Sequence, residues 1–155
     1  MTANLQHLGS YLAENIADDI RRFGRSVLCI GAEDDSPNFA YTIGNASPGV
    51  GLPELLVIGT NDAAFLNELS QKMIERHAAF DDGELVQLGG KFPLKIINAD
   101  RRAHSEYTIQ AGQYLGHENY RVQQVLISDR SGRFPDEPDC QPPYSKMPVL
   151  RQQRH

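Results

Sequence analysis

Residues 39–59, FAYTIGNASPGVGLPELLVIG, place two short apolar runs on either side of a loop rich in glycine and proline. The run at 39–43 mixes aromatic and β-branched residues, and the run at 55–58 is apolar throughout. Both compositions are typical of buried β-strands, whereas the intervening residues 44–53 favour a loop. The stretch therefore predicts two neighbouring strands, and the rest of the fold is expected to assemble around them.

Helices are predicted where apolar residues recur at steps of three and four. The first such stripe ends at Phe23, before Gly24, and its helix begins either near Leu5 or at Ser10, a good N-cap residue. Two further helices are expected, one that follows the capping residues 60–62 and reaches His77, and one at about 102–115. Further strands are expected at 26–31, 85–88, 94–97 and 120–127.

The order of these elements predicts an α+β fold with a mostly antiparallel sheet of about five to six strands, either open or barrel-like, and two to three packed helices. After Phe134 the chain changes character, because five of its nine prolines fall between Pro135 and Pro148. The sequence therefore predicts one domain over residues 1–134, followed by an extended proline-rich tail over 135–155 that lies on the domain surface.

The composition is that of an ordinary globular domain. Of the 155 residues, 40% are hydrophobic and 23% are charged, and the net charge of −5 argues against a nucleic-acid binder. No apolar run approaches membrane-spanning length, and the N-terminus does not resemble a signal peptide. We expect a soluble, cytoplasmic protein that binds neither nucleic acid nor membrane.

Three segments, in this order, resemble a widespread bacterial family described as domain of unknown function 4262. They are residues 39–44, residues 51–59 and residues 124–135, which read FAYTIG, GLPELLVIG and QVLISDRSGRFP. The resemblance runs from about Ser26 to Leu150 and implies a single domain of bacterial origin. It implies no activity, because the family has none established.

The chain departs from the family pattern at three positions. Asn45 stands where relatives usually carry leucine, Leu52 where they often carry histidine, and Asp136 where they often carry an aromatic residue. Any chemistry that depends on that histidine in relatives is therefore lost here.

Polar residues beside the two central strands form the first candidate ligand site. Tyr41 and Thr42 precede the glycine-rich loop that begins at Gly44, and Glu54 follows it. A carboxylate near a tyrosine hydroxyl can act as an acid–base pair or orient a ligand. Alternatively, Glu54 accepts backbone N–H bonds from the loop and the Tyr41 ring packs in the core. The sequence leaves both interpretations open.

Two further residues are candidates for the same kind of site. Gln124 lies in the last predicted strand, where a buried amide would need hydrogen-bonding partners. Arg133 follows the turn that Asp129 begins, and a guanidinium suits planar anions. The alternative for Arg133 is a solvated or surface-paired side chain.

The cysteines and histidines form no recognisable reactive cluster. Cys29 lies in an apolar run and is expected to be a buried hydrophobe, whereas Cys140 lies in the tail. His104 with Glu106 and His117 with Glu118 would lie at opposite ends of one continuous helix, where residues eleven apart are separated by about 16 Å, too far to share an ion. We therefore expect no metal site, and the sequence identifies no catalytic residue and no particular cofactor.

Two hypotheses for function follow. The favoured one is a non-catalytic binding or interaction module, whose tail docks on a protein partner or on a second copy of the chain. The alternative is a small-ligand-binding protein or an enzyme, with a flavin- or nucleotide-type ligand held near Tyr41, Thr42 and Glu54.

Overall fold

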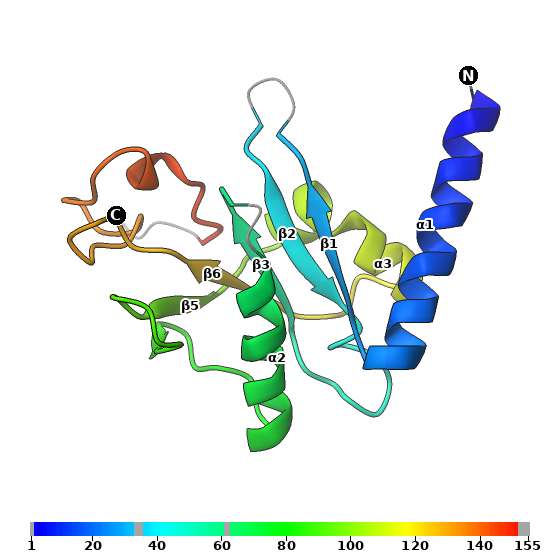
Figure 1. Ribbon diagram of the computed structural model, residues 1–155, viewed down its shortest axis with the longest axis horizontal. Coiled ribbons are helices and arrows are strands. Elements are labelled where there is room, and N and C mark those ends of the chain that lie inside the picture. The colour runs from blue at the N-terminus through cyan, green and yellow to red at the C-terminus, as the bar shows by residue number, and fades with distance from the viewer. Residues whose placement is uncertain (1, 33–35, 61–62, 152–155) are drawn as a thin grey trace.

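A computed structural model describes residues 2–32, 36–60 and 63–151, with the backbone alone for residues 2–11. It confirms the α+β class (Figure 1). The helices are α1 (Thr2–Phe23), α2 (Ala64–Arg76), the π-helix η1 (Ala103–Tyr107), α3 (Ile109–Leu115) and the 3₁₀ helix η2 (Tyr144–Lys146). The strands are β1 (Ser26–Ile30), β2 (Phe39–Ile43), β3 (Glu54–Ile58), β4 (Glu84–Val86), β5 (Leu94–Asn98) and β6 (Val122–Leu126).

The six strands form one open sheet in the order β1-β2-β3-β6-β5-β4. Four of its neighbouring pairs are antiparallel, and β3 pairs with β6 in parallel. The prediction of a mostly antiparallel sheet is therefore confirmed. The barrel-like alternative is wrong, because β1 and β4 remain at opposite edges.

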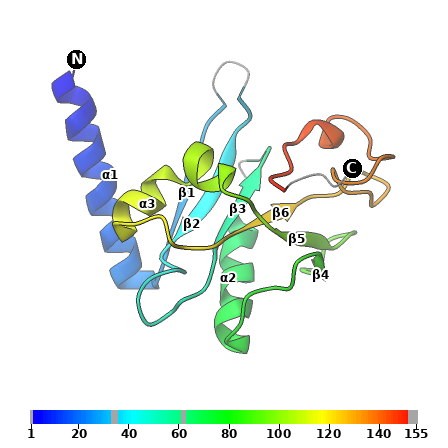
Figure 2. The same ribbon diagram turned by 180° about the vertical axis from the view of Figure 1, so that it is seen from behind.

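Helices cover both faces of the sheet (Figures 1 and 2). On one face, α2 packs its buried Leu66, Leu69 and Met73 against β-strand residues such as Val57 and Val125. On the other face, α1, η1 and α3 contribute apolar side chains to a second cluster around Tyr41, Ile43 and Leu56. The alternation of side chains along each strand therefore gives the sheet two apolar faces.

The predicted third helix is wrong as a single element. The chain forms the short π-helix η1, breaks at Thr108, and resumes as α3. The buried Thr108 hydroxyl donates to the Ala103 carbonyl at 3.2 Å and bonds the Tyr120 hydroxyl at 2.7 Å. Such side-chain bonds to nearby backbone compete with helical pairing, and this one ends the first segment.

The other helices differ from prediction mainly at their starts. Helix α1 already begins at Thr2, so the start at Ser10 is wrong, while Gly24 ends it with a φ of 85°. Helix α2 begins at Ala64, with Ala63 at its N-cap position. The predicted caps at 61–62 lie outside the described residues. No helix in the described ranges is long and apolar enough to cross a membrane.

The two cysteines are placed differently from expectation. Cys29 is exposed, because β1 is an edge strand, and the prediction of a buried residue there is wrong. Cys140 is buried, and its thiol donates to the Arg133 carbonyl at 3.3 Å. No disulfide joins them.

The segment after Phe134 folds back over the end of the sheet, beside β6 (Figures 1 and 2). It contains turns and the short helix η2, so it is not extended throughout. Its Leu150 side chain is 1% exposed and belongs to the same apolar cluster as Tyr41. Docking of this segment on a partner stays a prediction.

Candidate functional site

Glu54 organises the glycine-rich loop from within the fold. Its carboxylate is fully buried and accepts a bond from the Thr42 hydroxyl at 2.8 Å. It also accepts backbone N–H bonds from Gly44 at 2.9 Å, Asn45 at 3.1 Å and Ala46 at 3.0 Å. The structure thus brings Thr42, Gly44 and Glu54 together, in contacts that support the structural interpretation of Glu54.

Thr42 and Gly44 fit this network for separate reasons. The Thr42 hydroxyl also accepts the Leu55 N–H at 2.9 Å, and so replaces a ladder bond where β2 and β3 diverge. Gly44 has a φ of 126°, and a Cβ there would lie 2.8 Å from the Gly24 carbonyl oxygen. Only glycine fits a position with that backbone conformation and that close neighbour.

Burial controls the ionisation of Glu54. It raises the pKa of the carboxyl above its ordinary value, while the surrounding N–H groups and the Thr42 hydroxyl oppose the rise. The acceptor positions of the carboxylate are already used by the protein itself. Glu54 is therefore fitted to hold the loop in place.

Tyr41 lies on the opposite face of the sheet from the Thr42 side chain. Its hydroxyl donates to the Gln110 side-chain oxygen and accepts the Gln110 N–H at 3.3 Å. Burial raises the pKa of the phenol well above its usual range. The polar groups of Tyr41 and Glu54 therefore bond to separate partners, and the two side chains lie on opposite faces of the sheet.

Arg133 belongs to a turn held by another carboxylate. Asp129 accepts the N–H groups of Ser131 at 2.8 Å, Arg133 at 2.9 Å and Gln141 at 2.9 Å. The bond from the Arg133 N–H, aided by the others, lowers the pKa of Asp129. The Arg133 guanidinium donates to the Asp139 carbonyl at 3.3 Å, so both parts of the residue hold the turn.

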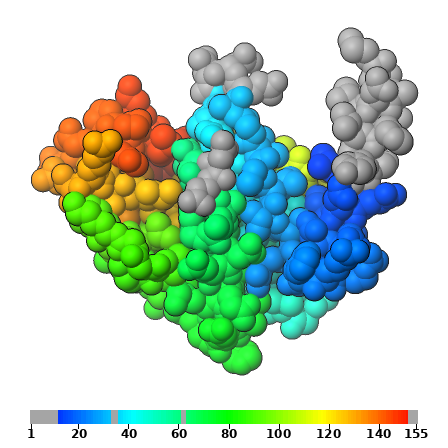
Figure 3. All heavy atoms as spheres, viewed as in Figure 1, coloured from blue at the N-terminus to red at the C-terminus, as the bar shows by residue number. Residues whose placement is uncertain are grey.

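Gln124 borders a cavity. This cavity, which we call the tail cavity, has a volume of about 360 Å³ and lies between the sheet and the C-terminal segment. Its described lining comprises Ile58, Gly59, Thr60, Gln124, Val125, Leu126, Ile127, Pro135, Pro143, Tyr144 and Met147. Figure 3 shows the C-terminal segment in the orange-to-red lobe at one side of the molecule.

The tail cavity opens where the parallel strands β3 and β6 end. In open sheets, the crevice beyond the carboxyl ends of parallel strands is a common ligand position. Gly59 follows β3 with a φ of 102°, and a Cβ there would lie 2.1 Å from the Met147 sulfur. The absence of a side chain at Gly59 therefore gives the Met147 thioether its place in the cavity wall.

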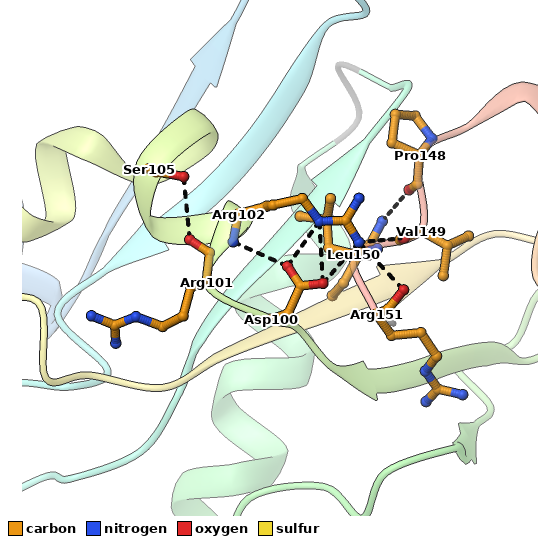
Figure 4. A network of polar contacts seen from close by, with 9 residues as sticks. Asp100, Arg101, Arg102, Ser105, Pro148, Val149, Leu150 and Arg151 are labelled. Atoms are coloured by element: carbon orange, nitrogen blue, oxygen red, sulfur yellow. Dashed lines mark hydrogen bonds and ion pairs between the residues drawn. The ribbon is translucent and has the colours of Figure 1, made fainter. Parts of the chain in front are cut away.

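The C-terminal segment is fastened to the sheet beside this cavity (Figure 4). The Gln124 side chain accepts the Leu150 N–H at 2.8 Å and donates to the Pro148 carbonyl at 2.7 Å. The Asp100 N–H donates to the Leu150 carbonyl at 2.7 Å. The Arg102 guanidinium binds the Asp100 carboxylate at 2.8 Å.

Sequence reasoning missed the part of the cavity wall formed by Pro143, Tyr144 and Met147. No local pattern marks these residues, because their position depends on the path of the C-terminal segment over the sheet. The proline content predicts an extended segment on the domain surface, but composition cannot specify where such a segment docks.

The chain reversal after α3 brings His104 and His117 to the same aromatic ring. Their ring centroids lie 4.6 Å and 6.5 Å from that of Tyr120, and all three residues line a second cavity of about 600 Å³. The assumption that one helix separates these histidines is wrong. Within the described parts of the chain, no three His, Cys, Asp or Glu side chains are grouped to hold a metal ion.

Two of the three segments that carry the family resemblance meet at the tail cavity. Ile58 and Gly59 end one segment, Gln124 begins the other, and Pro135 ends it. No curated protein and no solved structure shows a significant match to the chain. A family model described as Domain of unknown function (DUF4262) matches residues 19–141, so the chain belongs to this family.

Proposed function

We propose that this domain is a non-catalytic binding module whose tail cavity takes a small, neutral, largely apolar molecule. The observation that carries the proposal is the convergence of two family segments on one cavity at the ends of β3 and β6. A volume of about 360 Å³ lies within the range of small-molecule sites. The family resemblance and the absence of a disulfide between Cys29 and Cys140 favour a bacterial cytoplasmic setting.

The lining defines the class of ligand. Aliphatic side chains, two prolines, the Met147 thioether and the Tyr144 ring supply most of the described surface, and no described lining residue carries a charge. Aromatic rings pack well against such groups, and sulfur contacts with rings are favourable. A phosphate group would lack a cationic partner among these residues, which argues against a flavin mononucleotide or nucleotide here.

The proposed role is binding without catalysis because the two acid–base candidates in the central strands, which do not line the tail cavity, serve structure. Glu54 holds the glycine-rich loop, and Tyr41 bonds Gln110. Of the described residues that line the tail cavity, Tyr144 is the one with a titratable side chain. The described lining offers this phenol no second acid–base group with which to exchange a proton.

Ligand-observed NMR with indole as the probe tests this function. Indole should show saturation transfer from the wild-type protein, and its affinity should fall about tenfold in Tyr144→Ala, which removes an aromatic wall. Tyr114→Ala is the matched control, because Tyr114 lies on α3 and is 40% exposed. Equal binding by both variants, or no binding by the wild type, would overturn the proposal.

A further inference from the structure

The C-terminal segment forms the outer wall of the tail cavity and is anchored on both sides of that wall. At one end, the Gln141 N–H donates to the Asp129 carboxylate at 2.9 Å. At the other end, residues 148–151 bind Gln124 in β6 and the residues Asp100 and Arg102 that follow β5. We call this second anchor the latch. Between the anchors, residues 142–147 carry Pro143, Tyr144 and Met147 over the cavity.

Gln124 couples the latch to the cavity. It lines the cavity, is 1% exposed, and is fixed within β6 by its place in the sheet. Its amide donates to one main-chain group of the segment and accepts from another, at Pro148 and Leu150. It therefore pairs with the segment much as a neighbouring strand would.

Arg102 supplies one exposed contact of the latch (Figure 4), beside the ion pair of Arg151 with Asp82 at 2.6 Å. Its guanidinium holds the Asp100 carboxylate through Nη2 at 2.8 Å and Nε at 3.0 Å. The same Nη2 reaches the carbonyl oxygens of Val149 at 3.4 Å and Arg151 at 3.3 Å. These bonds are at the rim of the molecule, so they can break without unfolding the sheet.

Resting on the binding function above, we propose that residues 142–147 are a lid over the tail cavity and that release of the latch opens it. The lid lies outside residues 19–141, the stretch that the family model matches. Opening breaks the main-chain bonds at Pro148 and Leu150 and withdraws the buried Leu150 side chain. A ligand that contacts Tyr144 and Met147 stabilises the closed lid, because it binds that state.

Hydrogen exchange tests the lid without any ligand. Arg102→Ala should accelerate exchange of the Leu150 N–H about tenfold and leave the amides of β3 and β6 unchanged. Arg101→Ala is the matched control, because the Arg101 side chain bonds the Glu118 carbonyl at 3.1 Å and lies outside the latch. Asp100→Asn keeps the backbone N–H of the latch but loses the ion pair, and should act like Arg102→Ala.

Equal Leu150 exchange rates in Arg102→Ala and Arg101→Ala would overturn the lid. So would an acceleration in Arg102→Ala that extends equally to the amides of β3, because the domain would then be opening as a whole.

Indole binding separates the lid from the binding function. In the wild type, saturating indole should slow Leu150 exchange. In Arg102→Ala, NMR line shapes should show association and dissociation accelerated together about tenfold, with the dissociation constant nearly unchanged, as expected of a gate. If indole binds Arg102→Ala at the wild-type rates, the lid proposal is wrong and the proposed binding function is unaffected. Failure of indole to bind overturns the function, and the exchange rates alone then decide the lid.

Discussion

Glu54 and Asp129 each collect three backbone N–H groups, yet their pKa values move in opposite directions. Glu54 lies inside the fold beneath residues 44–46, and burial raises its pKa. Asp129 is covered by its own turn, and the N–H donors, with that of Arg133 first, lower its pKa. Three backbone N–H donors are thus compatible with either direction of the pKa shift, and the extent of burial of the carboxylate decides between them.

The largest expected effect comes from Glu54→Gln. Glutamine has nearly the same size but offers one acceptor oxygen, and its NH₂ group would face backbone N–H donors of the loop. We expect a loss of about 3 kcal/mol in the free energy of unfolding, measured by denaturant titration. The control Glu118→Gln changes an exposed carboxylate and should alter stability by less than about 0.5 kcal/mol. Equal effects would show that Glu54 does not anchor the loop.

Thr42→Val should have the next largest effect. It removes the hydroxyl that donates to Glu54 and accepts the Leu55 N–H, while nearly preserving side-chain volume. The Leu55 N–H then lacks its acceptor and the Glu54 carboxylate loses one donor. Together these losses should lower the free energy of unfolding by about 2 kcal/mol. Thr42→Ser keeps the hydroxyl and should lose less than half as much. A larger loss in Thr42→Ser would assign the effect to the methyl group.

The pH dependence of stability tests the comparison directly. With a folded pKa above the ordinary 4.5, Glu54 binds its proton more tightly in the native state than in the unfolded state. Its contribution is fully present below pH 4.5 and is lost as the pH rises through the folded pKa, by up to about 1.4 kcal/mol per pH unit. The difference in unfolding free energy between wild type and Glu54→Gln should therefore narrow as the pH rises.

For Asp129 the sign is reversed. Its lowered folded pKa gives a contribution that is present above about pH 3.8 and is lost as the pH falls through the folded pKa. If the difference in unfolding free energy between wild type and Glu54→Gln widened with rising pH, the N–H donors would have a larger effect on the pKa than burial at both carboxylates. The contrast between the two sites would then disappear.

The smallest effect on global stability is expected from Asp129→Asn, because that carboxylate holds a turn. The measurable change is at Cys140, whose thiol is buried beneath the turn and whose pKa burial raises. In a Cys29→Ser background, an aromatic disulfide reagent should modify Cys140 faster in Asp129→Asn than in the Asp139→Asn control. Equal rates would show that the turn persists without the Asp129 carboxylate.

Much of the sheet could be predicted from the sequence, because strand composition is a local property. The runs at 39–43 and 55–58 mark β2 and β3 closely. The bonds that Glu54 makes were also foreseeable, since a carboxylate beside a glycine-rich loop has few other donors within reach. In contrast, Cys29 looks buried in the sequence, and its exposure follows from the edge position of β1.

The tail cavity and the latch could not be predicted, because they depend on contacts between residues far apart in the chain. Gln124 and Leu150 are 26 positions apart, and their bond exists only when the C-terminal segment has docked. The break at Thr108 depends in the same way on Tyr120. Polar side chains that satisfy distant backbone groups leave no periodic signal in the sequence.

The position of β6 has a consequence for the order of assembly. The three-stranded unit β1–β3 and the hairpin β4–β5 share no direct strand pairing, and β6 lies between them. On a ribosome, both units emerge before residues 122–126 do, so the sheet stays divided until β6 is available. Completion of the sheet is therefore a late, long-range event, and the open edges of β3 and β5 are exposed to wrong pairing until then.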